Sequence, residues 1–196
     1  MDLHIVDIAA TAAERAAIDT VLDPVVGPVR GGWDGGERDI EKDGRVARGG
    51  HDARSHRDML LPALHAAQDT SGWISPAALA YICRRLTVPP AEAYGVASFY
   101  ALLATTPMPP AVAPVCDDMA CRLAGAEVVC ANLERELGPA GEPAPGATMT
   151  WKRSPCLGQC ERAPAAMFTV AGDPPVRRSI GPIDAAGVIA HLDAGL

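Results

Sequence analysis

Apolar positions recur with the 3.6-residue period of a helix in several segments of the first half of the chain. The segment 9–22 is rich in alanine and places Ile18 four residues before Leu22, so we expect a helix there. Residues 55–104 repeat the apolar pattern and predict three short helices that form a bundle. Ser75-Pro76 opens the second of these helices, because Ser is a favoured N-cap and Pro fits the first helical turn.

The second half of the chain mixes short apolar runs with helical patterns. The predicted strands are 111–115, 148–152, 165–170 and 176–180, and the predicted helices are 124–137 and 183–193. The order strand, helix, strand, strand, strand, helix predicts a small four-stranded mixed sheet with helices packed on it. The expected fold class is therefore α+β, with a three-helix bundle before the sheet.

Two stretches without such patterns divide the chain. Residues 27–50 are rich in glycine and charge, and such a stretch cannot bury enough apolar surface to order itself alone. The stretch is either a disordered linker or an arm that folds onto a partner subunit with Trp33 as its anchor. Four prolines between positions 107 and 114 predict a stiff connector. The predicted divisions are an N-terminal helix and arm at 1–52, a helical bundle at 53–106 and a second domain at 107–196.

Composition and charge exclude several classes of function. The net charge of −7 argues against a nucleic-acid partner, because phosphate binding needs a basic face. No window approaches the 18 or so apolar residues of a membrane helix, so we expect no direct membrane insertion. The N-terminus lacks the basic and apolar regions of a signal peptide, which predicts a cytoplasmic protein. The sequence contains no phosphate-binding loop and no recognisable catalytic triad, so we expect no bond chemistry from the chain alone.

Four of the six cysteines form two close pairs. Cys116 and Cys121 have C-x4-C spacing, Cys156 and Cys160 have C-x3-C spacing, and 34 residues separate the pairs. Iron–sulfur clusters are commonly held by four Cys thiolates, and plant-type 2Fe-2S ferredoxins also use an x4 spacing for their first pair. Structural zinc accepts four Cys as well, but its pairs usually lie closer in sequence. The spacing favours a 2Fe-2S cluster and leaves zinc as the alternative.

The residues around the pairs add to this prediction. Pro155 and Gly158 place the second pair in a tight loop, where backbone N–H groups can turn toward cluster sulfurs. Asp117 and Asp118 lie between the first two cysteines, and their charge should lower the reduction potential of a cluster. Two further cysteines on apolar helix faces are expected to be buried core thiols; they are Cys83 and Cys130.

These motifs together resemble the thioredoxin-like 2Fe-2S ferredoxin family, over about residues 57–194. The similarity rests on Cys116-x4-Cys121, on Cys156-Leu157-Gly158-x-Cys160 followed by Ala163-Pro164, and on the upstream segment 94–100 (YGVASFY). Members of this family are small iron–sulfur subunits of NADH:quinone oxidoreductase, of NAD-linked formate dehydrogenases and of bidirectional hydrogenases. The resemblance implies a thioredoxin-like fold for the second domain.

The resemblance further implies an electron carrier with no catalysis of its own. Its four ligands would be Cys116, Cys121, Cys156 and Cys160, and its electrons would come from FMN on an NADH-binding partner subunit. Further iron–sulfur, molybdenum or nickel subunits would complete the assembly. Arg153-Ser154-Pro155 departs from the acidic and apolar residues common at this place in complex I members, and 156–160 (CLGQC) looks closer to formate dehydrogenase gamma subunits. The alternative function is a structural four-Cys zinc module that mediates subunit interaction without a redox role.

Overall fold

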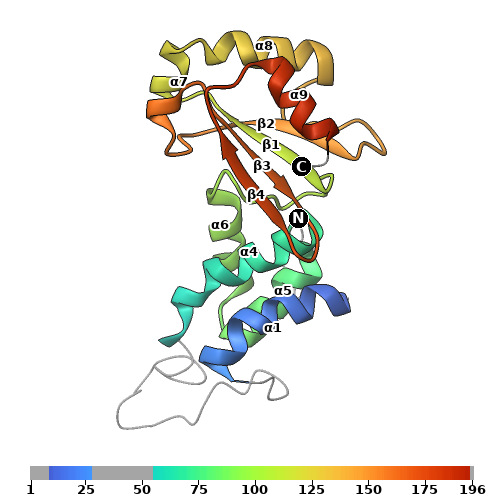
Figure 1. The fold of residues 1–196 in the computed structure, drawn as a ribbon. Helices are drawn as coiled ribbons and strands as arrows, with labels where there is room; N and C mark the ends of the chain where they lie inside the picture. The colour runs from blue at the N-terminus through green and yellow to red at the C-terminus, as the bar shows by residue number, and fades with distance from the viewer. Residues whose placement is uncertain (1–8, 28–54, 195–196) are drawn as a thin grey trace. The chain divides into compact units, whose positions relative to one another are not determined.

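The computed structural model describes residues 9–27 and 55–194 of the chain (Figure 1). The chain forms two compact units, whose boundary lies between Thr106 and Pro107. The first unit is helical and the second contains a four-stranded mixed sheet, so the predicted α+β class is confirmed. Trp33 and most of the glycine-rich segment around it lie outside the described residues. Within the described part of the chain, no helix has the length and apolar character needed to cross a membrane.

The first unit is built from helices that share one apolar core. Its described elements are α1 (Ala12–Val26), η1 (Arg57–Met59), α4 (Leu60–Ser71), α5 (Pro76–Leu86) and α6 (Pro90–Phe99). Ile18 and Leu22 of α1 are buried in the same cluster as Leu64 of α4 and Ile82 of α5. Helices of this length are marginally stable alone, so this shared core stabilises them. Helix α1 therefore packs onto α4 and α5, two of the three helices predicted between residues 55 and 104.

Helix α1 begins later and ends later than the sequence predicts. A capping box sets its start: Thr11 Oγ1 accepts a hydrogen bond from the Glu14 N–H, and the Glu14 carboxylate accepts one from the Thr11 N–H. The helix continues through Pro24 to Val26. Pro24 lies in the last turn, where the loss of one backbone hydrogen bond does not end the helix.

The Glu14 carboxylate also joins α1 to α5. The Ser75 hydroxyl, which caps α5, donates a hydrogen bond of 2.7 Å to Glu14 Oε1, and Glu14 is only 3% exposed. Burial would raise the pKa of this carboxyl, but the hydrogen bonds from Ser75 and Thr11 outweigh it and the pKa lies below its ordinary value. The buried carboxylate is thus held in its ionised form.

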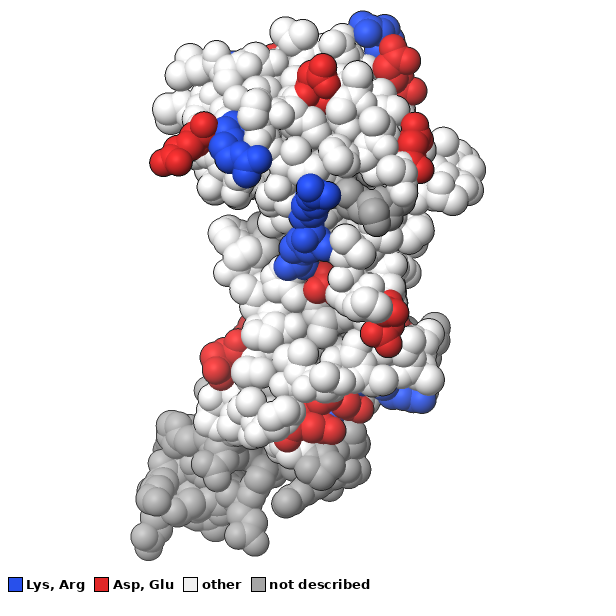
Figure 2. Space-filling view, viewed as in Figure 1, with Lys and Arg blue, Asp and Glu red and all other residues white. Residues whose placement is uncertain are grey.

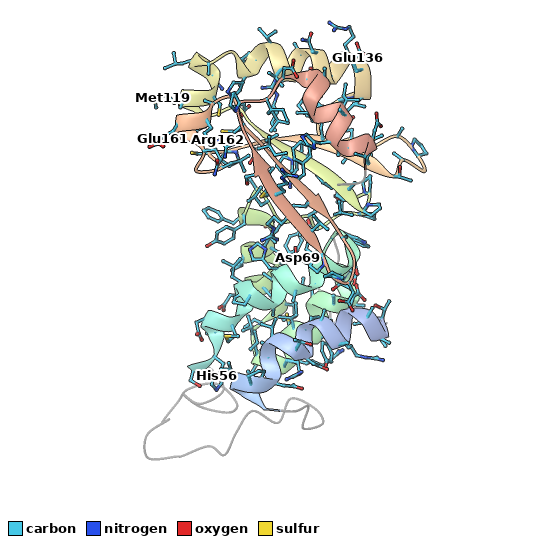
Figure 3. All side chains as sticks on the ribbon, viewed as in Figure 1. His56, Asp69, Met119, Glu136, Glu161 and Arg162 are labelled. Atoms are coloured by element: carbon cyan, nitrogen blue, oxygen red, sulfur yellow. The ribbon has the colours of Figure 1, made fainter. Side chains whose placement is uncertain are left out.

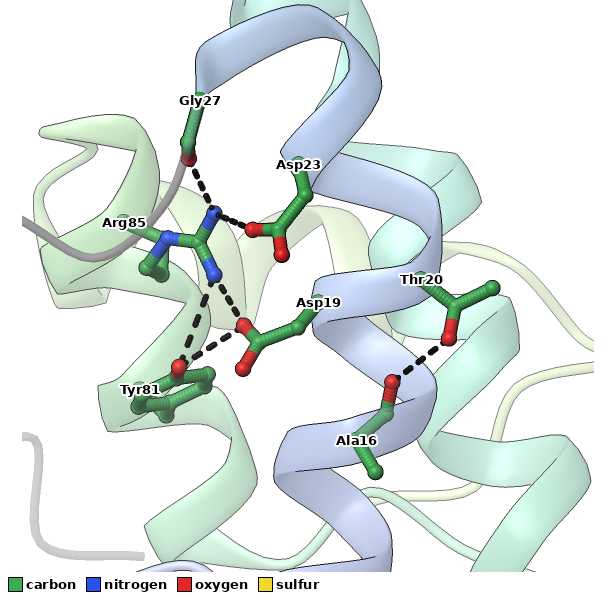
Figure 4. Close-up of polar contacts among 7 residues, drawn as sticks. All are labelled: Ala16, Asp19, Thr20, Asp23, Gly27, Tyr81 and Arg85. Atoms are coloured by element: carbon green, nitrogen blue, oxygen red, sulfur yellow. Dashed lines mark hydrogen bonds and ion pairs between the residues drawn. The ribbon is translucent and has the colours of Figure 1, made fainter.

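Arg85 of α5 holds the other end of α1 (Figure 4). Its side chain is 5% exposed, and its guanidinium contacts the carboxylate of Asp19 and lies 2.8 Å from that of Asp23. The same group donates a 2.9 Å hydrogen bond to the carbonyl of Gly27, at the C-terminal end of the helix. The Tyr81 hydroxyl donates to Asp19 at 2.7 Å. The buried Arg85 cation thus pairs with two carboxylates and also gives a donor to a carbonyl that has no partner within the helix.

The second unit contains one mixed sheet and its helices. Its elements are β1 (Ala111–Cys116), α7 (Met119–Leu123), α8 (Ala126–Leu137), β2 (Met149–Ser154), η2 (Cys160–Arg162), β3 (Ala166–Val170), β4 (Val176–Ile180) and α9 (Ala185–Asp193). The strand order is β2-β1-β3-β4, with β1 parallel to β2 and antiparallel to β3. Pro114, the last of the four connector prolines, lies inside β1, as the predicted strand 111–115 implies. Helix α7 was not predicted.

The core of the second unit lies between the sheet and the helices α8 and α9. Trp151 of β2 and Phe168 of β3 are fully buried there with Leu133 of α8 and Val188 of α9. The Trp151 indole N–H donates to the carbonyl of Gly138 at 2.9 Å, which satisfies the one polar group of that side chain. The two cysteines predicted as core thiols are confirmed as fully buried; they are Cys83 and Cys130.

Charge is dispersed over the surface that Figure 2 shows. On this face, the described Lys, Arg, Asp and Glu side chains lie in small groups separated by uncharged surface. Among the described residues of this face, local ion pairs therefore dominate the electrostatics, and no broad field of one sign forms.

Replacement of Arg85 by Met should loosen α1, because Asp19 and Asp23 lose their cation and Gly27 loses a donor. We expect the free energy of opening that protects the α1 amides from hydrogen exchange to fall by about 2 kcal/mol. The loss is smaller than for a fully buried ion pair because Asp23 is half exposed. Arg84→Met is the matched control and should change this opening free energy by less than about 0.5 kcal/mol. Equal α1 protection in both variants would contradict the role of Arg85.

Replacement of Glu14 by Gln should have a pH-dependent effect on stability. The folded-state pKa of Glu14 lies below its unfolded value of about 4.3, so ionisation stabilises the fold above that pH and the gain is lost as pH falls through the folded pKa. Urea unfolding should show a wild-type advantage over Glu14→Gln that is constant above about pH 5 and shrinks below about pH 4. A difference that stays constant from neutral pH to about pH 3 would show that the carboxylate is not ionised.

Candidate functional site

The four predicted ligand cysteines line one pocket at the edge of the sheet. The pocket has a volume of about 320 Å³, and its other lining residues are Asp118, Met119, Ala120 and Leu123. Cys116 is the last residue of β1 and Cys121 lies on α7. Cys156 follows β2, and Cys160 is the first residue of η2. Two segments far apart in sequence thus place all four thiols in one pocket.

The parallel pairing of β1 with β2 explains why these segments meet. Cys116 pairs with Ser154 at the end of the ladder, and the Asp117 N–H continues it with a 3.1 Å hydrogen bond to the Ser154 carbonyl. Pro155 has no N–H and cannot extend the ladder, so the chain leaves the sheet just before Cys156. On the other side of β1, the Cys116 N–H donates to the carbonyl of Ala165 at 3.0 Å. Cys116 is therefore fixed from both sides.

The two pairs differ in their exposure to solvent. Cys116 and Cys121 are each 2% exposed and pack against Ala126 and Ala165. Cys156 and Cys160 are exposed. The pocket therefore has one pair of thiols in the protein interior and one pair at the surface.

Within each pair the thiols contact each other. Cys156 Sγ lies 3.4 Å from Cys160 Sγ. Burial, and then a hydrogen bond with Cys116, raises the pKa of Cys121 to about 11. A hydrogen bond with Cys156 and the negative charge of its thiolate raise the pKa of Cys160. A bound metal cation would counteract the raised pKa of Cys121 and Cys160, because it stabilises the thiolate form of its ligands.

The donor set fits a two-iron cluster. Such a cluster is held by four Cys thiolates, and here two contacting pairs share one pocket. Among residues 9–27 and 55–194, no group of three or more His, Cys, Asp or Glu side chains is already close enough together to hold a metal ion. Each iron of such a cluster takes two of the four thiolates, so two contacting thiol pairs in one pocket fit its two irons.

The loop between the second pair directs a backbone N–H at the sulfur of a predicted ligand, as the sequence predicts. The Gly158 N–H donates to Cys156 Sγ at 3.4 Å. Gly158 has φ +72°, a left-handed backbone conformation that residues other than Gly, Asn and Asp rarely adopt. Glycine at this position therefore allows the turn that aims the donor, and N–H bonds to sulfur favour the reduced state of a cluster.

Both aspartates of the first segment are engaged by the protein, although loop carboxylates are often only solvated. Asp117 Oδ2 lies 3.0 Å from the guanidinium of Arg153, which also lies 3.1 Å from Glu127. Asp118 Oδ1 accepts the Met119 N–H at 2.7 Å and caps α7. Five residues are too few for a hydrophobic period to reveal α7. Asp is a favoured N-cap residue, so Asp118 was the one feature of the sequence that could have indicated the start of this helix.

Exposed apolar side chains lie beside the exposed thiols. Met119 is 76% exposed and Leu123 is 88% exposed, and both line the pocket. Figure 3 labels Met119 on α7, and Glu161 and Arg162 of η2 at the same end of this unit. Large exposed apolar side chains beside a functional pocket are typical of a surface that another molecule covers.

Comparison with known proteins supports the assignment. The family described as thioredoxin-like 2Fe-2S ferredoxin matches residues 48–174. NADH-quinone oxidoreductase subunit 2 of Thermus thermophilus is 36% identical over 109 residues, which are 55% of this chain and 60% of that protein. A subunit of the NADH-quinone oxidoreductase of Pseudomonas aeruginosa is 31% identical over 119 residues, which are 60% of this chain and 72% of that protein.

A solved structure agrees with the sequence comparisons. The NAD+-reducing NiFe-hydrogenase in its air-oxidised state is similar with a TM-score of 0.55 and 26% sequence identity. The similarity covers 70% of this chain but only 23% of the hydrogenase chain. The resemblance seen in the sequence is thereby confirmed. From its mixed sheet and the match over residues 48–174, we conclude that the chain belongs to the thioredoxin-like 2Fe-2S ferredoxins, a family whose cofactor is a 2Fe-2S cluster.

Proposed function

We propose that this chain is an electron-transfer subunit of an NAD(H)-linked oxidoreductase complex that exchanges single electrons with FMN on an NADH-binding partner subunit. The observation that carries the proposal is the pocket that joins one buried and one exposed pair of thiols. The 2Fe-2S cluster, when bound, supplies a one-electron acceptor and donor. The protein supplies the ligands, excludes water on one side and leaves the other side accessible.

The proposed ligands have different environments and therefore different roles. Cys116 and Cys121 would anchor the cluster in the interior, where water and oxidants have little access. Cys156 and Cys160 would hold it at the surface, on the side from which an electron partner approaches. Electron transfer needs such an approach, whereas a structural zinc site does not require its ligands to be accessible to a partner. The exposure of one pair thus supports a carrier over the zinc alternative.

Apolar surface supports the proposed docking of a partner. Met119 and Leu123 lie beside the exposed thiols, and an apolar rim of this kind favours close contact between proteins. In the helical unit, Phe99 and Tyr100 are exposed and form an edge-to-face pair with ring centroids 5.3 Å apart. We propose that both surfaces contact the flavoprotein subunit. Aromatic side chains are common anchors of such interfaces.

The proposed assembly is one of three kinds. The relatives described above are subunits of NADH-quinone oxidoreductases and an NAD+-reducing hydrogenase. The formate dehydrogenase alternative, with a molybdenum subunit, rests on the sequence of residues 156–160. We also propose a cytoplasmic location. Helix α1 of the predicted N-terminal part (1–52) shares the apolar core of the bundle (53–106), so we propose that these two parts act as one unit beside the ferredoxin domain (107–196).

Replacement of any one proposed ligand by Ala should strip or destabilise the cluster, because a centre of this type needs all four thiolates. The variants are Cys116→Ala, Cys121→Ala, Cys156→Ala and Cys160→Ala, and the readout is the visible absorption of the purified protein. Cys83→Ala and Cys130→Ala are controls that should keep the spectrum and cost about 1 kcal/mol of packing. A bleached Cys130→Ala beside a coloured Cys121→Ala would contradict the ligand set.

Electron transfer should require the flavoprotein. The cluster-loaded chain alone should neither bind nor oxidise NADH, because its sequence has no nucleotide-binding loop. A trace of an FMN-containing NADH-binding subunit should allow NADH to bleach the visible band of the loaded chain, with Cys121→Ala as the cluster-free control. NADH oxidation by the pure chain, or no bleaching in the presence of an active flavoprotein, would refute the proposal.

A further inference from the structure

The two aspartates between the first ligand cysteines are adjacent in sequence but have different surroundings. We infer that Asp118, and not Asp117, is a positioning residue of the cluster site: its carboxylate bonds the two ligand segments together and supplies the uncompensated charge that lowers the potential of the bound cluster. The inference rests on the proposed ligand set.

Asp118 is hydrogen-bonded to both ligand segments. Its Oδ1 accepts the Met119 N–H at 2.7 Å, in the segment that carries Cys121. Its Oδ2 accepts the N–H of Cys156 itself at 3.2 Å, a residue 38 positions further along the chain. Asp118 also lines the pocket together with the four thiols. One carboxylate therefore spans the gap between the two halves of the ligand set.

The hydrogen bond from Cys156 to Asp118 lies just beyond the end of the β-ladder that fixes the second segment. The β1–β2 ladder ends with Ser154, whose carbonyl accepts the Asp117 N–H. Pro155 has no N–H to donate. Cys156 is exposed, so burial does not fix its backbone. The Asp118 carboxylate binds the N–H of this residue, and it thereby sets the position of the third ligand relative to the first two.

Asp117 has a different role. Its carboxylate faces Arg153 at 3.0 Å, and that guanidinium is shared with Glu127 at 3.1 Å. Neither Asp117 nor Arg153 is among the residues that line the pocket. The charge of Asp117 is therefore balanced by a cation outside the pocket. No ion pair formed among the described residues involves Asp118, so its charge is not balanced in this way.

An unbalanced carboxylate at the site should act on the potential in two ways. A negative charge close to the ligands disfavours the reduced and more negative state of the cluster. The carboxylate also occupies the Cys156 N–H, which is then not free to donate to a sulfur. Both effects lower the potential.

The test compares Asp118→Asn with Asp117→Asn in the full-length, cluster-loaded protein, by a redox titration monitored by EPR. Asn keeps the size of Asp but removes the charge and one acceptor. We expect an upward shift of the midpoint potential in Asp118→Asn and a clearly smaller shift in Asp117→Asn. Asp118→Glu, which restores the charge, should return the potential toward the wild-type value.

The second readout needs no cluster. In the metal-free protein, amide hydrogen exchange at Cys156 should be about tenfold faster in Asp118→Asn, because a charge-assisted hydrogen bond is lost. Exchange in β1 should be unchanged in all variants, which shows that the fold is intact. An unchanged potential or an unchanged Cys156 amide in Asp118→Asn, or an equal potential shift in Asp117→Asn, would overturn the inference. Failure of the wild-type protein to bind a cluster would instead refute the proposed function.

Discussion

The candidate site depends on the parallel pairing of β1 with β2. Because parallel strands end at the same edge of a sheet, Cys116 and the segment after Ser154 arrive side by side although 34 residues separate the two cysteine pairs. The connection between these strands carries α7, which brings Cys121, and α8, whose Leu133 packs in the core with Trp151 of β2. A shift of one residue in this register would turn the side chains of one strand to the opposite face and separate the thiols.

Burial then divides the site into an inner and an outer half, and polar contacts join the halves. The inner thiols of Cys116 and Cys121 lie in an alanine-lined interior, while the outer thiols of Cys156 and Cys160 face solvent beside exposed apolar side chains. A pocket that was closed on all sides would protect a cluster but would keep electron partners away. In the helical unit, buried charge has a structural use instead, since Arg85 and Glu14 fix the two ends of α1 through α5.

Local patterns predicted much of this structure, and long-range contacts account for what they missed. Alternation and helical period predicted the α+β class and the four-stranded mixed sheet, and the apolar faces placed Cys83 and Cys130 in the cores. The five residues of α7 are too few to show a period. In sequence, Asp117 and Asp118 are equivalent, and only contacts with residues more than 30 positions away, Arg153 and Cys156, distinguish them.

The most direct measurement of the site is the content of iron, acid-labile sulfide and zinc in the full-length protein purified without oxygen. The thiol pairs predict about two irons and two sulfides per chain, with little zinc, because four Cys thiolates complete a two-iron centre. About one zinc per chain and no labile sulfide would contradict this prediction, and would make the four cysteines a structural metal site.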